Sequence, residues 1–376
     1  KMLLDRRLIQ NFDWVLLILL IIIAGVSILN LYSSTYPIRE IGGAQIFKKQ
    51  IYWFLIGFFV FFMMTTFNYS LLERMAFPAY FISVILLVIV LIVGKVSSGS
   101  QRWLVLGPIS FQPSELMKIA MVMVLAKFFS EQGGSSEYRL RDLWQPFLLI
   151  LFPFAFILKE PDLGTALFLA LLSASMVLIA KVHWKSLLIF FAACASFAPF
   201  VWIGLKDYQR ARIMTFINPD MDPLGAGYHI NQSKIAIGSG FLWGKGFLQG
   251  TQTRLHFLPE QHTDFAFSVL AEEWGLIGSV ALLFLYLFLI LWGLNIARSS
   301  KDRFGSMMAI GIVGIVFWQV VINVGMVTGL LPVVGIPLLL FSYGGSSLIT
   351  SMAALGLLMN ISMRRFMFQQ AQFLGR

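Results

Sequence analysis

Asp264 stands where a polar stretch meets a long apolar run, in the sequence LPEQHTDF (258–265). At the edge of an apolar environment a carboxylate is partly desolvated, so its pKa can rise towards that of a useful general base. The alternative is a helix N-cap, in which the side chain accepts hydrogen bonds from the first backbone N–H groups of the helix. Residue type and position alone favour the cap.

Glu115 and Lys118 lie at the start of another apolar run, after the triplet QPS (112–114). A spacing of three residues places both on one helix face, where they can form an ion pair. Such a pair could simply neutralise two charges in an apolar setting. Alternatively, the compact Lys118 ammonium binds an anionic diphosphate.

The sequence KEPDLG (159–164) predicts a tight turn between two apolar runs, because Pro161 and Gly164 suit a turn. Charged residues in turns usually face water, and this interpretation is favoured for Glu160. For Asp162, exposure to water and a place in a functional site fit the sequence equally well.

Three arginines, Arg102, Arg210 and Arg212, stand in segments between apolar runs. A guanidinium binds phosphate oxygens in a bidentate manner and tolerates burial at an interface. Lipid headgroups and a phosphorylated substrate would both satisfy this chemistry.

Other kinds of site find no support in the sequence. Neither the HExxH zinc pattern, a GxSxG motif nor a Walker A loop occurs. The single cysteine, Cys194, cannot form a disulfide within these residues. The glycine-rich stretch 238–246 follows no predicted strand, so a dinucleotide-binding fold is not expected.

The elements that would hold these residues are membrane-spanning helices. Of 376 residues, 58% are hydrophobic and 12% charged, and the mean hydropathy is +0.82, which is too apolar for a water-soluble core. The net charge of +10 comes from Lys and Arg scattered through short segments. It therefore indicates membrane topology and no nucleic-acid partner.

Each long apolar run is predicted to be a helix, because a span takes roughly 20 residues and lipid-exposed backbone must bond internally. The prediction is an all-α integral membrane protein, one polytopic domain over residues 1–376. Glycines of the ninth run, such as Gly311 and Gly314, are expected to allow close helix packing. The ten predicted transmembrane helices are 14–33, 51–67, 75–94, 113–129, 144–158, 163–180, 185–205, 265–297, 304–328 and 337–362.

Positive charge predicts the orientation. With the first residue inside, fifteen Lys and Arg fall in inner segments and six in the short outer loops, so both termini are expected in the cytoplasm. The connection between helices 7 and 8, residues 206–264, is 59 residues long and rich in Phe, Leu, Ile, Trp and Gly. It is therefore predicted to be a structured loop folded against the outer membrane face.

Taken together, these segments resemble the SEDS family (shape, elongation, division and sporulation), and its RodA branch more than its FtsW branch. The resemblance runs from the first predicted helix to the last. The motifs that carry it are RW (102–103) with GP (107–108), FQPSE (111–115) with Lys118, PDLGTA (161–166), NP (218–219), DPLGAGYH (222–229), QS (232–233), AIGSG (236–240), FLPE (257–260), HTDF (262–265) and YGGSS (343–347).

The resemblance implies a peptidoglycan glycosyltransferase that polymerises lipid II during cell elongation, in the bacterial inner membrane with its active site on the outer face. It implies that Asp264 is catalytic and that Glu115, Lys118 and Asp162 line the active cavity. The implied partners are a class B penicillin-binding protein, which is a transpeptidase, and other elongation-complex proteins. One departure is Lys49, where many relatives are expected to have Arg, so a bidentate contact is not expected there.

The implied chemistry is one inverting displacement. Asp264 takes the proton of the acceptor sugar's 4-hydroxyl, which attacks the donor's anomeric carbon and expels a polyprenyl diphosphate. The leaving diphosphate needs charge stabilisation. The candidates for this role are Lys118, Arg102, Arg210 and Arg212, with room for a divalent cation, Mg or Mn, as cofactor.

Two other kinds of function remain open at the level of sequence. A lipid II flippase needs a polar path through the membrane, and only Glu272 and Glu273, deeper in the eighth helix, suggest one. A scaffold would recruit the crosslinking enzyme without chemistry of its own. An FtsW-like division paralogue is a variant of the favoured function.

Overall fold

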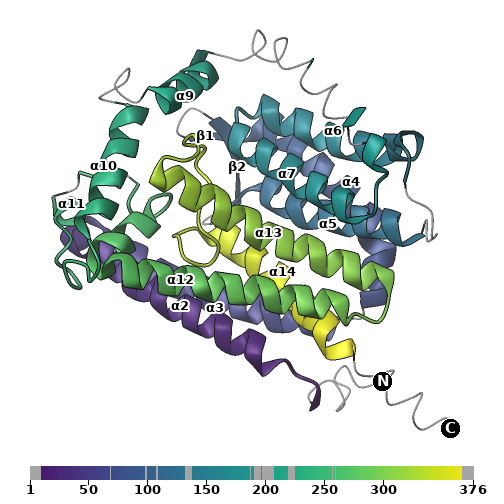
Figure 1. Ribbon diagram of the computed structural model, residues 1–376, viewed down its shortest axis with the longest axis horizontal. Coiled ribbons are helices and arrows are strands. Elements are labelled where there is room, and N and C mark those ends of the chain that lie inside the picture. The colour runs from purple at the N-terminus through teal and green to yellow at the C-terminus, as the bar shows by residue number, and fades with distance from the viewer. Residues whose placement is uncertain are drawn as a thin grey trace.

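Long helices, packed side by side, form a bundle that carries a smaller helical segment at one end (Figure 1). The computed structural model describes residues 10–67, 69–97, 100–106, 109–131, 138–186, 188–189, 196, 207–218, 225–255, 257–258 and 260–365.

The first long helices are α2 (Trp14–Thr35), α3 (Gly43–Thr66) and α4 (Tyr69–Val93), with a 3-10 turn, Tyr36–Ile41, between α2 and α3. Helices α3 and α4 begin earlier than the corresponding predicted spans, 51–67 and 75–94. Large apolar side chains along these helices are exposed, for example Ile21, Phe59 and Ile85. Apolar surface of this extent matches contact with lipid rather than water.

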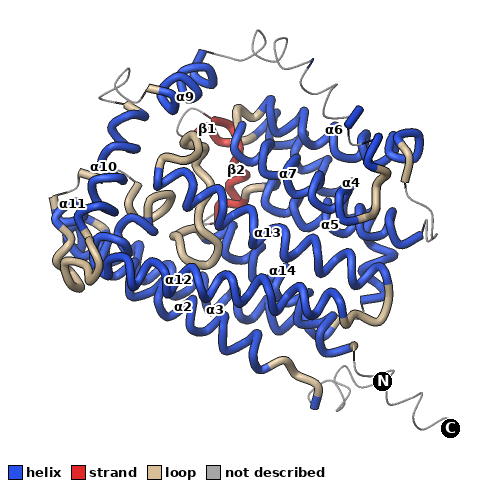
Figure 2. Tube along the Cα trace, viewed as in Figure 1, coloured by secondary structure: helices blue, strands red, loops and turns tan. Residues whose placement is uncertain are grey.

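A small antiparallel sheet joins α4 to α5, so the all-α prediction was wrong at this point. Its strands are β1 (Lys95–Ser97), β2 (Ser100–Leu106) and β3 (Ile109–Phe111), in the order β1-β2-β3. Figure 2 shows it in red at one end of the helices. The strands are too short for a clear alternating pattern in the sequence. The sheet fixes the position of Arg102 on β2.

The next helices are α5 (Pro113–Glu131), α6 (Trp144–Lys159) and α7 (Leu163–Ile179), within two residues of the predicted spans. Helix α5 is buried along nearly its whole length and packs between α4 and α13. Gly311 of α13 makes this possible, since an added Cβ there would lie 2.5 Å from Val122 of α5. The predicted close packing at this glycine is confirmed.

The described part of the 206–264 connection contains turns and three helices. The helices are α9 (Asp207–Ile217), α10 (Ala226–Ser239) and the short α11 (Thr251–Arg254). Helix α10 packs against α12 and α13. The preceding predicted span, 185–205, lies almost wholly outside the described residues.

The last long helices are α12 (Ala266–Arg298), α13 (Arg303–Thr328) and α14 (Gly345–Arg364). Helix α12 breaks at Gly275, whose φ of +64° suits only glycine. Residues 241–246 supply the missing hydrogen bonds. Leu276 N–H donates to Phe241 O at 2.8 Å, and Lys245 N–H donates to Glu272 O at 3.0 Å.

The predicted helix 337–362 was wrong over its first eight residues, because α14 begins at Gly345 and residues 330–344 form an irregular loop. The loop is buried at Ile336 and at 338–341. Irregular backbone within a membrane protein is tolerated where protein satisfies it. Here the loop carbonyls accept hydrogen bonds from the side chains of Asn323, Tyr286 and Ser27.

Seven helices among the described residues are long and apolar enough to cross a membrane, and the chain is a multi-pass membrane protein. Helix α7 is apolar but shorter. Helix α5 carries Glu115, Lys118 and Lys127 within 19 residues. The total of ten includes the span at 185–205 and remains a prediction.

Candidate active site

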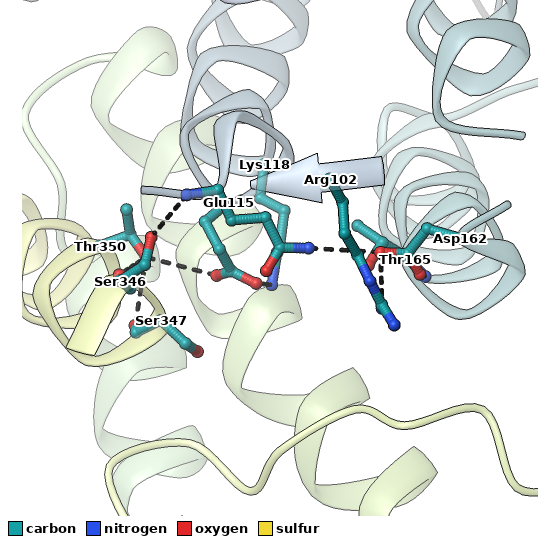
Figure 3. A network of polar contacts seen from close by, with 9 residues as sticks. Arg102, Glu115, Lys118, Asp162, Thr165, Ser346, Ser347 and Thr350 are labelled. Atoms are coloured by element: carbon teal, nitrogen blue, oxygen red, sulfur yellow. Dashed lines mark hydrogen bonds and ion pairs between the residues drawn. The ribbon is translucent and has the colours of Figure 1, made fainter. Parts of the chain in front are cut away.

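Asp162 joins three elements at one end of the bundle (Figure 3). It is the N-cap of α7, and its Oδ1 accepts a hydrogen bond from Thr165 N at 3.1 Å. Its Oδ2 accepts from Arg102 Nη1 on β2 and from Gln112 Nε2 before α5, both at 3.2 Å. The side chain is 3% exposed, so the alternative of a turn residue facing water is wrong for Asp162.

Glu160 was also expected to face water, and this was wrong, because its side chain is fully buried. Neither carboxylate oxygen has a hydrogen-bond partner among the described residues. Burial and the nearby charge of Asp162 raise the pKa of Glu160 from 4.5 to about 8, against a lowering by Arg102. Near neutral pH this group is therefore a neutral carboxylic acid.

The predicted Glu115–Lys118 ion pair is present, with Lys118 Nζ 2.7 Å from Glu115 Oε1 and both side chains buried. Thr350 Oγ1 of α14 donates to Glu115 Oε2 at 3.3 Å. Lys118 Nζ also lies 4.8 Å from the centre of the Phe168 ring. An ammonium held between a carboxylate and a ring face is positioned and still has donors for an anion.

A small cavity borders this pair, deep between α5, α13 and α14. It is lined by Glu115, Lys118, Gln319, Thr350 and apolar neighbours. The Gln319 amide is fully buried, and neither of its polar atoms has a partner among the described residues. The cavity is therefore polar on several sides although it lies within the bundle.

Asp264 does not cap α12, contrary to the simpler expectation. Phe265 is the N-cap, and no side chain caps the helix. The main chain at Asp264 is held by Asn323 Nδ2, which donates to Asp264 O at 2.9 Å. On the other side lies the loop before α14, since a Cβ added to Gly335 would be 3.3 Å from Asp264 Oδ2.

Burial, together with nearby Glu260, raises the pKa of Asp264 from 3.8 to about 6, even though Arg102 and Arg212 lower it. Asp162 adds a further increase. Charges act on one another over several ångströms, so these effects place the four other charged side chains in the same region as Asp264. The structure thus brings Asp264, Arg102, Arg212 and Asp162 to one place from four separate parts of the chain.

The remaining predicted arginine, Arg210, lies with Arg212 on α9, and both side chains are partly buried. Arg210 is not among the groups that affect the pKa of Asp264. Of the two arginines on α9, Arg212 is the one whose charge lowers the pKa of Asp264.

Glu272 and Glu273, which had suggested a transport path, hold the segment between α10 and α12 in place. Glu272 Oε1 accepts from Lys245 Nζ at 2.7 Å and from Gln252 N at 3.0 Å. Glu273 is hydrogen-bonded to Ser33 of α2. Both carboxylates are therefore used in packing α10–α11 and α2 against α12.

A divalent cation was allowed for in the sequence prediction. Among the described residues, no three His, Cys, Asp or Glu side chains gather as metal ligands. Arg102 pairs directly with Asp162, which removes that carboxylate as a ready ligand. The side chains described here do not form a metal cage.

A family model described as "Cell cycle protein", covering FtsW, RodA and SpoVE, matches residues 11–366. The chain belongs to this family. The predicted SEDS membership and RodA-like character are therefore confirmed.

Curated members of the family match over nearly the whole chain. Peptidoglycan glycosyltransferase MrdB of Escherichia coli (strain K12) is 42% identical over 362 residues, which cover 96% of each protein. Peptidoglycan glycosyltransferase RodA of Treponema pallidum (strain Nichols) is 33% identical, covering 96% of this chain and 99% of its own.

Solved structures of family members share the fold. One comes from a peptidoglycan synthase complex that coordinates polymerization and crosslinking. It matches with a TM-score of 0.82 and 33% identity over 95% of this chain and 99% of that one. The crystal structure of the rod shape determining protein RodA of Thermus thermophilus matches with a TM-score of 0.70 and 31% identity, covering 94% and 98%.

Sequence reasoning overlooked several residues that support this SEDS site. Gln112 was only part of a motif, but it links β3 and α5 to Asp162, and its backbone N–H donates to Ser346 Oγ. Gln319 and Asn323 are spaced by four in an apolar helix. That spacing was the available signal, because buried amides in membrane helices are usually functional.

Proposed function

We propose that this chain is a RodA-type peptidoglycan glycosyltransferase, in which Asp264 is the general base that activates the acceptor sugar. The activity class rests on the family and on full-length similarity to proteins named peptidoglycan glycosyltransferases. The role of Asp264 rests on one observation. Its carboxylate caps no helix and receives no hydrogen bond from a described residue, and burial raises its pKa to about 6 although the charges of Arg102 and Arg212 lower it.

A base of this kind suits the reaction. With a pKa of about 6, Asp264 is mostly ionised at neutral pH and is a stronger base than an ordinary Asp. It takes the proton of the acceptor's 4-hydroxyl. The hydroxyl oxygen then forms a bond to the donor's anomeric carbon, while the bond from that carbon to the polyprenyl diphosphate breaks with inversion.

Three cationic side chains, those of Arg102, Arg212 and Lys118, are proposed to stabilise the departing diphosphate. Arg102 and Arg212 lie around Asp264, and bidentate arginines stabilise developing phosphate charge. Lys118 contributes from the buried pair with Glu115. Arg210, on the same helix as Arg212, is assigned to the edge of the same substrate site.

Asp162 then acts through Arg102 rather than on the sugar. Its two oxygens are already engaged by Thr165, Arg102 and Gln112. The carboxylate fixes the guanidinium between β2 and α7 in a position from which it reaches Asp264 electrostatically. Asp162 is therefore a positioning residue for substrate binding.

The site belongs at the outer surface of a bacterial inner membrane, with both termini in the cytoplasm. Support comes from the charge distribution and from the 206–264 connection, whose helix α10 packs against α12, the helix that follows Asp264 (Figure 1). Lipid II is the substrate that fits an outer, membrane-level site. A class B penicillin-binding protein is the proposed crosslinking partner, by similarity to a complex that coordinates both reactions.

The test is lipid II polymerisation by the full chain with its partner, comparing wild type with Asp264→Asn at equal amounts of folded protein. Loss of a general base should reduce the rate by at least about 100-fold. Glu260→Gln is the matched control, because it removes a neighbouring exposed carboxylate from the same turn. It should form a normal ladder of glycan strands.

Equal ladders from wild type and Asp264→Asn would remove Asp264 from catalysis. If neither protein made polymer but lipid II crossed the membrane, the flippase would replace the transferase. Loss in both Asp264→Asn and Glu260→Gln would point to damage of the turn rather than loss of a base.

A further inference from the structure

An open cavity of about 480 Å³ lies far from the candidate active site, between the start of α6 and the end of α7. Arg139, Leu140, Arg141, His183 and Ser186 line it. Its volume is within the range of cavities that bind small ligands. None of these residues takes part in the proposed glycosyl transfer.

Two chain segments build the cavity through backbone hydrogen bonds. Tyr138 N donates to Lys181 O at 3.1 Å, and His183 N donates to Tyr138 O at 3.0 Å. This bridge holds the segment before α6 against the segment after α7. Lys181 has a φ of +65°, so the turn leading into His183 is tightly bent.

The cavity lies at the end of the bundle opposite Asp264. Arg303, at the start of α13, is close enough to Tyr138 to affect its titration. At this same end Arg365, just after α14, donates to Ser299 and lies 3.9 Å from Asp13 before α2. The described ends of the chain are therefore on the cavity's side of the membrane.

The lining is cationic and rich in hydrogen-bond donors. Arg139 and Arg141 contribute two guanidinium groups, which match phosphate oxygens. His183 Nδ1 accepts a hydrogen bond from Lys185 N at 3.2 Å, which fixes the orientation of the ring at the cavity. Asp142 is an acid in this segment, and its carboxylate is engaged by the Arg139 backbone N–H at 2.9 Å.

Exposed aromatic side chains place the cavity at headgroup depth. Trp144 begins α6 and is 58% exposed, and Trp184 beside the cavity is 61% exposed. The Lys185 ammonium lies 5.8 Å from the Trp184 ring centre. Exposed tryptophans next to lysines are typical of the membrane–water interface. A phosphate bound here would thus lie at the level of lipid phosphates.

We propose that this cavity binds the phosphate headgroup of an anionic phospholipid from the leaflet on the Asp13–Arg365 side. The exposed side chain of Leu140 gives the opening an apolar edge along which an acyl chain leaves the cavity. Free phosphate would use the same donors but not this edge. The site is independent of the glycosyl transfer and does not depend on the proposed function.

The test is native mass spectrometry of the full chain in detergent, with phosphatidylglycerol and phosphatidylcholine of identical acyl chains. Wild type should bind phosphatidylglycerol more tightly. Arg139→Gln with Arg141→Gln should weaken that binding roughly 10- to 30-fold, because each cation near the surface contributes about 1 kcal/mol.

The matched control is Arg74→Gln with Arg298→Gln, which removes two exposed cations outside the cavity. This variant should bind as wild type does. Arg139→Lys with Arg141→Lys keeps the charge and should retain most of the lipid preference, which distinguishes lost charge from misfolding.

Three results would overturn the proposal. The first is equal binding of the two lipids by wild type. The second is equal weakening in the Arg74/Arg298 control. The third is displacement of phosphatidylglycerol by millimolar inorganic phosphate with no dependence on the acyl chains, which would show a phosphate site rather than a lipid site.

Discussion

Asp13 and Asp264 each precede a membrane helix, at opposite ends of the bundle, and their environments differ completely. Asp13 caps α2, where its Oδ1 accepts from Leu16 N. Its carboxylate also accepts from Trp292 Nε1 and from Ser362 Oγ at 2.6 Å. No described residue donates to the Asp264 carboxylate, although it is partly buried and its pKa is raised.

The number of hydrogen bonds that each carboxylate accepts determines whether it stabilises the fold or stays open to a ligand. The hydrogen bonds to the Asp13 carboxylate compensate its charge inside the protein, and they connect α2, α12 and α14. A carboxylate without donors is destabilised when ionised and keeps its oxygens for an incoming ligand. The molecule therefore holds the Asp13 carboxylate in hydrogen bonds at one end, and at the other end it leaves the Asp264 carboxylate without a donor from a described residue.

The largest expected effects come from the isosteric pair Asp13→Asn and Asp264→Asn, measured as thermal midpoints in one detergent at pH 7. Asp13→Asn should destabilise by roughly 2–3 kcal/mol, because charged hydrogen bonds are lost inside the protein. Asp264→Asn should stabilise, by up to about 3 kcal/mol, because it removes a charge whose folded pKa exceeds 3.8. If both substitutions changed the thermal midpoint in the same direction, the proposed difference between Asp13 and Asp264 would be contradicted.

Glu160→Gln tests whether the buried, unpartnered carboxyl is protonated. Its folded pKa of about 8 exceeds the ordinary 4.5, so wild-type stability should fall as pH rises from about 4.5 towards 8. The Gln variant should be more stable at pH 7 and should show a flatter dependence over this window. Parallel melting curves against pH for the two proteins would contradict the assignment.

The pH dependence of polymerisation tests the base directly. Asp264 must be deprotonated to act, so the rate should fall about tenfold between pH 7 and pH 5. Glu260→Gln removes a charge that raises the pKa of Asp264, so the midpoint should move to lower pH. A rate constant that does not change between pH 5 and pH 7 would exclude this group as the base.

Lys49→Arg should have the smallest effect. The Lys49 side chain is exposed, in contrast to Gln50, which is buried and lies near Ser342. Exposed substitutions of equal charge usually change stability by less than 0.5 kcal/mol. A large gain in polymerisation would show instead that a bidentate contact forms at this position when substrate is bound.

Hydropathy predicted most helices because lipid contact and burial both require long apolar runs. The apolar character of residues 337–344 also explains the main error, which was to predict a helix where the chain forms a loop. Residues 338–341 are as apolar as a helix interior, and they are buried, but in an irregular loop whose carbonyls are satisfied by side chains. Gly335, with its φ of +72°, and the two prolines at 332 and 337 were the local signals against a helix there.

The site was only partly predictable. The Glu115–Lys118 pair follows from helical spacing and was confirmed. The burial of Glu160 and the triple contact of Asp162 depend on β2 and α5 arriving from elsewhere in the chain, which no local pattern encodes. For Asp264, local rules favoured a helix cap, which was wrong, and its catalytic role, implied by the family resemblance, stays a prediction.

The break at Gly275 has a consequence for the order of folding. Leu276 and Ile277 N–H groups bond to Phe241 and Leu242 of the preceding segment instead of to their own helix. Because residues 241–246 precede α12 in the chain, they leave the ribosome first and are present when α12 inserts. Residues 241–246 then supply the hydrogen bonds that α12 lacks at its break. If the chain is cut between residues 246 and 266, we expect α12 to form this break only when both fragments are present during membrane insertion.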